Sequence, residues 1–281
     1  MSSTRTTFFS PARVYWLTRN TVLEAVRQRL FTIIMVLTVF LVGSAVFLRE
    51  FNFGSSELKF IADFGFGALT FFGSILAIVA SAQLFFSEIE NRTALTVLAK
   101  PVLRAEFVLG KFLGVFAVLL VFSCLVGGAL AVVLRMRESA LMAADPDAFA
   151  HARTMAYDSI AVFVGLQWLK FGVIAAFTML IASFAQTSLF AVITAFLILT
   201  ICHLQHLAQD AWTRMGNPLA RVAARGLGLV FPNFQVFNLG DRVAAGATLP
   251  WPLTGRIAAF AIAYVIVLLA LASFSFRRRE I

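Results

Sequence analysis

The stretch FGVIAAFTMLIASFAQTSLFAVITAFLILTICHL, residues 171–204, contains no Asp, Glu, Lys or Arg and decides the fold class. As one helix, its 34 residues would extend about 51 Å, which is too long for a single crossing of a hydrocarbon core about 30 Å thick. A polar cluster, Ser183, Gln186, Thr187 and Ser188, interrupts the stretch near its middle. We therefore predict two membrane-spanning helices joined by a tight turn.

The composition of the whole chain agrees with this stretch. Its 281 residues are 60% hydrophobic and only 13% charged, whereas soluble domains carry about 25% charged residues. These values exclude a soluble enzyme, a disordered chain and a secreted disulfide scaffold. Since the apolar blocks are continuous and lack the alternation of barrel strands, backbone pairing in lipid requires helices. The predicted class is an all-α integral membrane protein.

Apolar blocks of about 20 residues, the length that crosses a bilayer, predict six transmembrane helices. The segment that precedes them, residues 1–29, is predicted to hold an amphipathic helix that lies at the cytoplasmic interface, because Val14 and Leu17 alternate with Arg13 and Arg19 at near-helical spacing. Residues 30–281 are predicted to form a single six-span domain. The predicted spans are Leu30–Leu48, Phe64–Phe86, Phe112–Leu134, Ser159–Ser183, Ser188–His206 and Ile257–Ser275.

The distribution of basic residues predicts that both termini are cytoplasmic. The segments on the termini's side hold 12 Lys and Arg in 64 residues, and those on the other side hold 10 in 89 residues. The net charge of +9 is explained by such membrane-flanking residues, so nucleic acid is not a predicted partner. We expect a multi-pass protein of a bacterial inner membrane.

Several catalytic and metal-binding motifs are absent from the sequence. Gly110-Lys111 is followed by Phe112 and lacks the upstream glycine of a phosphate loop, so the chain is not expected to hydrolyse ATP. His203 and His206, with Asp210 one turn further, offer a metal site as an alternative, but histidines at a helix end are the favoured interpretation. No metal site is therefore predicted.

Lys170 lies near the centre of the fourth predicted span. A charge at that depth costs at least about 2.5–3.5 kcal/mol on insertion scales. The other five spans carry no Asp or Glu, and Asp158 is about 18 Å away along the helix axis. We expect Lys170 to face an aqueous cavity or a second protomer; the alternative is that its side chain extends outward to the interface.

The stretch FFSEIENRTALTVLAKPVLRAEFVLGKFLG, residues 85–114, joins the second and third predicted spans. Acids, bases and apolar residues are interleaved, which predicts a short helix over residues 87–99 that ends before Pro101. Such a helix can dock into a partner protein or lie along the lipid headgroups, and the residues alone favour neither. At the start of the third predicted span, Gly110 and Gly114 form a small-x-x-x-small pattern that indicates helix packing.

This loop resembles the signature region of type-2 ABC transporter permeases, with an acidic span end, Arg-Thr, a Leu-rich run, Lys-Pro, and Gly-Lys before the next span. The six-span layout and the segment FPNFQVFNLGD, residues 231–241, are also similar. Within the family, the chain is similar to permeases of nitrous-oxide-reductase maturation and gliding-motility systems. The resemblance implies a cytoplasmic coupling helix between spans two and three, which binds an ATPase. The implied ATPase-coupling residues are Glu88, Glu90, Arg92, Thr93, Leu95, Leu98, Lys100, Pro101, Arg104 and Lys111.

The resemblance also implies partners. It predicts a transport permease that catalyses no reaction, pairs with a second permease copy and receives motion from a dimer of separate ATPase subunits, which bind ATP and Mg. Membrane lipids are expected partners, and an extracytoplasmic or additional membrane subunit is left open. The alternative function is an ATPase-coupled scaffold that transmits force to outer partners without transporting a substrate. A secondary transporter is disfavoured because the predicted spans contain no proline.

Overall fold

The computed structural model describes residues 9–47, 56–90, 103–144, 155–214, 226, 228 and 230–277, without the side chains of 88–90, 208–209, 211–214 and 277. Helices dominate these residues, and the described part of the chain contains no strand. The all-α class is therefore confirmed. The main helices are α1 (Pro11–Arg27), α2 (Arg29–Ser44), α3 (Glu57–Glu90), α5 (Arg104–Ala144), α7 (Tyr157–Phe184), α8 (Ser188–Arg214) and α11 (Trp251–Arg277).

Five of these helices are long and apolar enough to cross a membrane, namely α3, α5, α7, α8 and α11. Each contains one of the last five predicted spans, and the break between Phe184 and Ser188 lies where the hairpin turn was predicted. The helix α5 has 41 residues, about 61 Å at 1.5 Å per residue, so it extends well beyond the hydrocarbon core. The apolar block predicted only its central part.

The first predicted span, Leu30–Leu48, corresponds to α2, which ends earlier than predicted. Its 16 residues stop at Ser44, where the hydroxyl of Ser44 donates a 2.8 Å hydrogen bond to the carbonyl of Leu41. With α1, from which it is bent by 66°, α2 forms a broken pair that makes the sixth candidate span. The division into residues 1–29 and 30–281 stays a prediction.

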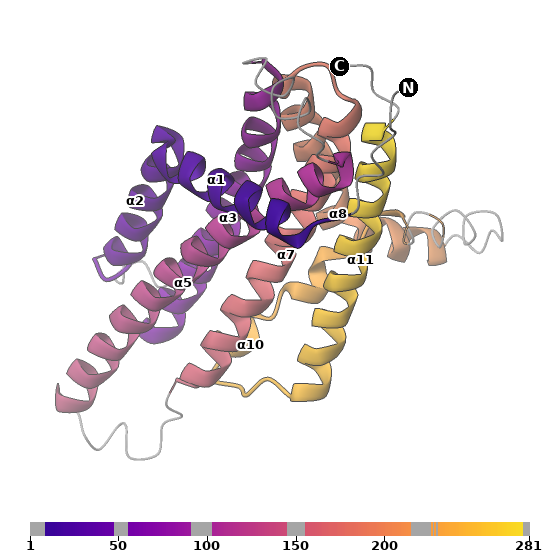
Figure 1. The fold of residues 1–281 in the computed structure, drawn as a ribbon. Coiled ribbons are helices and arrows are strands. Elements are labelled where there is room, and N and C mark those ends of the chain that lie inside the picture. The colour runs from indigo at the N-terminus through magenta and orange to yellow at the C-terminus, as the bar shows by residue number, and fades with distance from the viewer. Residues whose placement is uncertain are drawn as a thin grey trace, which may run out of the picture.

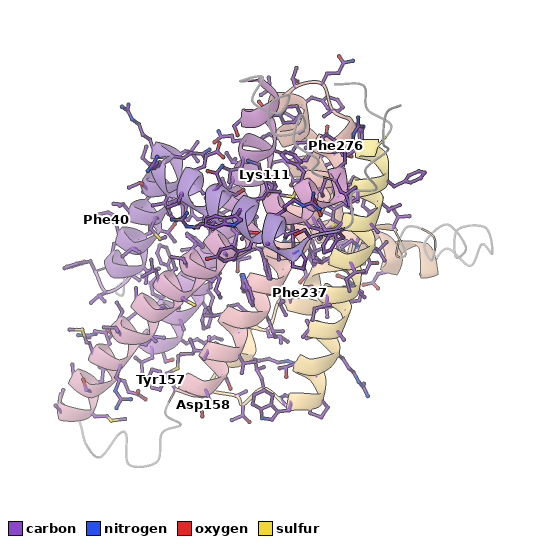
Figure 2. All side chains as sticks on the ribbon, viewed as in Figure 1. Phe40, Lys111, Tyr157, Asp158, Phe237 and Phe276 are labelled. Atoms are coloured by element: carbon purple, nitrogen blue, oxygen red, sulfur yellow. The ribbon has the colours of Figure 1, made fainter. Side chains whose placement is uncertain are left out.

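The helices define two ends of the bundle (Figure 1). At one end, which we call the α1 end, α1 lies across the start of α5. Aromatic contacts place the last turns of α3 and α11 beside the same part of α5. At the opposite end, the carboxylate of Glu138 accepts hydrogen bonds from the start of α7, and Arg137 forms an ion pair of 2.5 Å with Glu57. Figure 2 shows Lys111 and Phe276 at the α1 end and Tyr157 and Asp158 at the opposite end.

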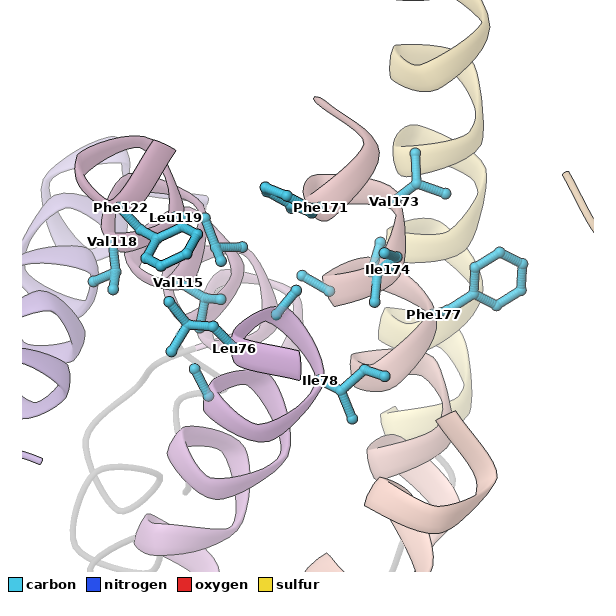
Figure 3. Close-up of a cluster of buried hydrophobic side chains, with 14 of the residues drawn as sticks. Leu76, Ile78, Val115, Val118, Leu119, Phe122, Phe171, Val173, Ile174 and Phe177 are labelled. Carbon is cyan, nitrogen blue, oxygen red and sulfur yellow. The ribbon is translucent and has the colours of Figure 1, made fainter. Parts of the chain in front are cut away.

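The core of the bundle lies between α3, α5 and α7. Leu76 of α3, Phe122 of α5 and Phe171 of α7 are almost fully buried there (Figure 3). Large apolar side chains of α8 and α11, such as Leu197 and Ile266, are instead exposed on the surface of the chain. Apolar residues all around a helix are expected where lipid replaces water on its outer face.

The amphipathic helix α1 packs against α5 through the small-x-x-x-small pattern. Gly110 and Gly114 are buried against α1, and Thr18 donates a 3.3 Å hydrogen bond to the carbonyl of Gly110. A Cβ atom added at Gly114 would lie 2.5 Å from the Cβ of Thr21. The pattern therefore joins α1 to the candidate span in α5, because only glycine lets the two backbones approach so closely.

We predict that Gly114→Ala loosens α1 from α5 and lowers the free energy of unfolding by about 1–3 kcal/mol, the usual cost of overpacking. The matched control is Gly128→Ala on the same helix, where an added Cβ meets nothing within 4 Å. This control should be neutral or stabilising, because alanine favours helix more than glycine does. Thermal unfolding in detergent measures both variants, and equal midpoints for the two would contradict the packing role.

Candidate functional site

Most of the predicted ATPase-coupling residues lie outside the described part of the chain. Arg104 and Lys111 are described in full, and Glu88 and Glu90 are described only as backbone in the last turn of α3. Their role in coupling stays a prediction. The coupling residues that the structure does not describe are Arg92, Thr93, Leu95, Leu98, Lys100 and Pro101.

Glu106, in the first turn of α5, joins this helix to α1. Its carboxylate is fully buried and accepts hydrogen bonds from the backbone N–H groups of Ser10, at 2.6 Å, and Leu103, at 3.0 Å. It also forms a 3.0 Å ion pair with Arg13. An acid at the third helical position that accepts from the N-cap N–H stabilises the start of a helix, and its charge complements the helix dipole. Glu106 therefore fixes where α5 begins.

Arg104 binds the last turn of α11. Its guanidinium donates a 2.8 Å hydrogen bond to the carbonyl of Phe276 and lies 5.8 Å from the centre of the Phe276 ring. Three buried rings, Phe85 of α3, Phe107 of α5 and Phe276 of α11, meet beside it with centroids 5.5 to 5.8 Å apart. Edge-to-face and stacked pairs at this spacing stabilise a contact beyond the area that they bury.

Lys111 is also buried in this region. Its ammonium forms a 3.3 Å ion pair with Glu24 of α1 and lies 5.9 Å from the centre of the Phe107 ring. Lys111 therefore holds α1 against α5 within the chain. Any part that it plays in coupling would be transmitted through α1, because its side chain is not exposed.

These contacts form one cluster, which we call the inner junction: Glu106, Arg104, Lys111 and the three phenylalanines. It joins α1, α3, α5 and α11 at the point where residues 91–103 connect α3 to α5. Of its members, the sequence singled out Arg104 and Lys111 for coupling. Glu106, Phe85 and Phe276 were missed, since only the fold brings residues so distant in sequence together.

Lys170 lies inside the bundle and does not face lipid. Its side chain is 3% exposed, and its Nζ lies 3.2 Å from Nε2 of His203 and 5.4 Å from the centre of the Phe234 ring. No carboxylate was expected at this depth, and the partner is instead an imidazole. Neither expectation for Lys170 describes this arrangement: the side chain is enclosed by its own chain and paired with His203, so it neither extends outward nor faces an aqueous cavity or a second protomer.

The hydrogen bonds of His203 define its tautomer. Its Nδ1 lies 2.9 Å from the carbonyl of Leu199, which can only accept, so Nδ1 carries the proton. In the neutral ring, Nε2 is then an acceptor and receives a hydrogen bond from the Lys170 ammonium. Among the described residues, no group of three or more His, Cys, Asp or Glu is placed to hold a metal ion.

The segment FPNFQVFNLGD returns into the bundle beside this pair. It contains the 3-10 helix η2 (Phe234–Phe237) and leads into α10 (Gly240–Ala244). Phe234 and Phe237 are buried, and the carbonyl of Phe237 accepts a 2.9 Å hydrogen bond from the side chain of Gln167. Non-helical backbone is tolerated at membrane depth only where protein groups satisfy it, as Gln167 does here.

A cavity of about 490 Å³ lies between α3, α8, α7 and this returning segment. His203 lies on its wall, so the Lys170–His203 pair borders the cavity. The other lining side chains include three hydroxyls, two carboxylates, one amide and four phenylalanines. These residues are Asp63, Phe66, Thr70, Phe71, Ser74, Phe163, Phe196, Thr200, Asn238 and Asp241.

We predict that His203→Ala lowers the free energy of unfolding by about 1.5–3 kcal/mol, because it removes the acceptor of a buried charged donor. The matched control, His206→Ala, removes only a local hydrogen bond to the carbonyl of His203 and should change stability by less than about 0.5 kcal/mol. Equilibrium unfolding in detergent measures both. The double variant Lys170→Met with His203→Leu should lose less unfolding free energy than His203→Ala, because it leaves no unpaired ammonium in the bundle. Equal losses of unfolding free energy in His203→Ala and His206→Ala would contradict the pairing.

Comparison with known proteins identifies the family. A model of the ABC-2 family transporter protein matches residues 15–214, more than half of the chain. This range includes most of α1, every member of the inner junction except Phe276, and both members of the Lys170–His203 pair. No curated protein matches the sequence. The finer likeness to permeases of nitrous-oxide-reductase maturation and gliding-motility systems stays a prediction. The chain belongs to the ABC-2 family of membrane transporter proteins.

Proposed function

We propose that the chain is the membrane-spanning permease subunit of an ABC transporter, driven by separate ATPase subunits that bind ATP and Mg. The observation that carries this proposal is the inner junction. Residues 91–103 connect α3 to α5. The ion pairs of Glu106 and Lys111 join the start of α5 to α1, and the contacts between the rings of Phe85, Phe107 and Phe276 join it to the ends of α3 and α11. A partner that moves this connection therefore moves four helices together.

The long helix α5 carries such a motion across the membrane. It begins at the inner junction and reaches the opposite end, where Arg137 and Glu138 bind the first turns of α3 and α7. Because a helix is stiff along its axis and its core contacts are close-packed, displacement at one end changes the arrangement at the other. The proposed function of the chain is to convert this motion into movement of a substrate.

In this proposal, the α1 end faces the cytoplasm of a bacterial cell. The basic side chains Arg19, Arg27 and Arg29 lie at this end, and Arg19 lies 5.5 Å from the centre of the exposed Trp16 ring. Arginine and tryptophan together are typical of a helix that rests among anionic headgroups. The 91–103 segment then meets the ATPase in the compartment where ATP is available.

A second permease copy completes the proposed transporter, since six spans enclose no protected path across a bilayer on their own. A scaffold that transmits force without transport would use the same inner junction. We propose the transporter because the family that matches the chain is one of transporter proteins. An extracytoplasmic or additional membrane subunit stays open.

We predict that Leu95→Ala with Leu98→Ala weakens binding of the ATPase, because apolar anchors in an interface each contribute more than about 1 kcal/mol. Both leucines lie in the predicted docking helix. Co-purification of the ATPase with the variant, at equal membrane expression, measures the loss. Folding should be retained, and full co-purification together with full coupled activity would contradict the docking role of this segment.

We predict a different result for Arg104→Ala, which removes the contact with Phe276 of α11. The ATPase should still co-purify, but transport-coupled ATP hydrolysis should fall by about tenfold, because α11 no longer follows α5. The matched control is Arg256→Ala, an exposed arginine at the opposite end of α11. Loss of ATPase binding in Arg104→Ala would instead place Arg104 in the docking surface itself.

A further inference from the structure

The cavity beside Lys170 has a charge distribution that selects its ligand. Asp63 on α3 and Asp241 in α10 both line it, and Asp241 is exposed at its mouth. Lys59 lies one turn before Asp63 and is the nearest cation on the same helix. Two carboxylates that share a partly buried space are stabilised by a cation between them. This end of the cavity therefore favours a positively charged group.

The other end of the cavity disfavours a second cation. His203 lines this end, and behind it lies the ammonium of Lys170. Both ring nitrogens of His203 are already used, Nδ1 by the carbonyl of Leu199 and Nε2 by Lys170. A ligand is therefore oriented with its cationic group toward Asp63 and Asp241.

Between these ends, the walls are aromatic. Phe66, Phe71, Phe163 and Phe196 line the cavity, and the rings of Phe66 and Phe163 lie 4.5 Å apart. Phenylalanine faces attract an ammonium group and also pack against an apolar body. The side chains of Phe71 and Thr200 are exposed on α3 and α8, so the cavity opens between these helices on the apolar surface of the bundle.

We propose that this cavity is a binding site for an ammonium group carried on an apolar body. The ammonium group lies between Asp63 and Asp241, and the apolar body lies against the phenylalanines. A volume of about 490 Å³ is within the range of small-molecule sites, about 300–1,000 Å³. The ammonium group can belong to a soluble amine or to the headgroup of an aminolipid. The cavity is bordered both by the exposed carboxylate of Asp241 and by the exposed apolar side chain of Phe71, so either kind of ligand can enter.

Binding of two small probes to the purified full-length chain tests the site without any ATPase. The probes are benzyltrimethylammonium and its uncharged carbon isostere, neopentylbenzene, and the chain is placed in nanodiscs of phosphatidylglycerol, which contain no ammonium group. We expect the charged probe to bind at least about tenfold more tightly than its isostere, since only the charged probe meets the carboxylates. Binding to empty nanodiscs is subtracted.

Two variants locate the site. Asp63→Asn with Asp241→Asn should weaken the charged probe by about tenfold and leave the isostere within about twofold, whereas Thr200→Trp should weaken both by filling the cavity. The matched control is Asp158→Asn, which removes an exposed carboxylate from the end of the bundle opposite α1 but outside the cavity. It should leave the affinity for both probes unchanged. Since Asp241 is exposed, Asp241→Asn alone keeps the test valid if the double variant fails to fold.

A second set of nanodiscs, which contain phosphatidylethanolamine, distinguishes the two sources of the ammonium group. If phosphatidylethanolamine displaces the charged probe from the original chain, the ligand is an aminolipid; if it does not, the site takes a soluble amine. Equal affinity for the two probes, or unchanged binding of the charged probe in both carboxylate variants, would overturn the proposal. Either result leaves the proposed ATPase-driven transport unaffected, because binding is measured in the chain alone.

Discussion

A charged side chain that is buried in a membrane bundle must find its partner inside the protein. This constraint determines the contacts of the inner junction and of the Lys170–His203 pair. Glu106 is paired with Arg13 and two backbone N–H groups, Lys111 with Glu24, and Lys170 with His203. Removing one partner from such a pair is far more costly than removing both. The position of α1 on α5, and of α8 beside α7, follows from satisfying these few charges.

The apolar pattern was sufficient to predict most of the fold. Five spans were predicted within their helices, because a block of about 20 apolar residues has few alternatives in a bilayer. The pattern failed where helices continue in polar sequence: α5 runs on through Arg135 and Glu138 to Ala144, where contacts with α3 and α7 stabilise it. A prediction from hydropathy alone ends where the apolar block ends, although the helix itself continues into polar sequence.

The candidate site was predicted less completely, for reasons that differ between its parts. Lys170 lies 16 residues before Gln186 in the predicted hairpin turn and His203 lies 17 residues after it, so an antiparallel hairpin places them opposite each other. This pairing was available from the sequence and was missed, because the search was for a carboxylate. Glu106 and Phe276, by contrast, are 170 positions apart and on non-consecutive helices. No local pattern brings them to one junction.

The helix α7 connects the two regions that these charges organise. On one face, Lys170 and Gln167 hold Phe234 and the carbonyl of Phe237, so they fix the returning segment that forms a wall of the cavity. On another face, the indole of Trp168 stacks on Phe116 of α5 with centroids 4.2 Å apart and donates a 3.0 Å hydrogen bond to the Phe116 carbonyl. Because α7 is packed on both faces, it cannot move gradually relative to α5 or to the returning segment. Close-packed contacts of this kind change between discrete arrangements. The shape of the cavity therefore depends on how α5 and α7 sit against each other, and the inner junction is where α5 begins.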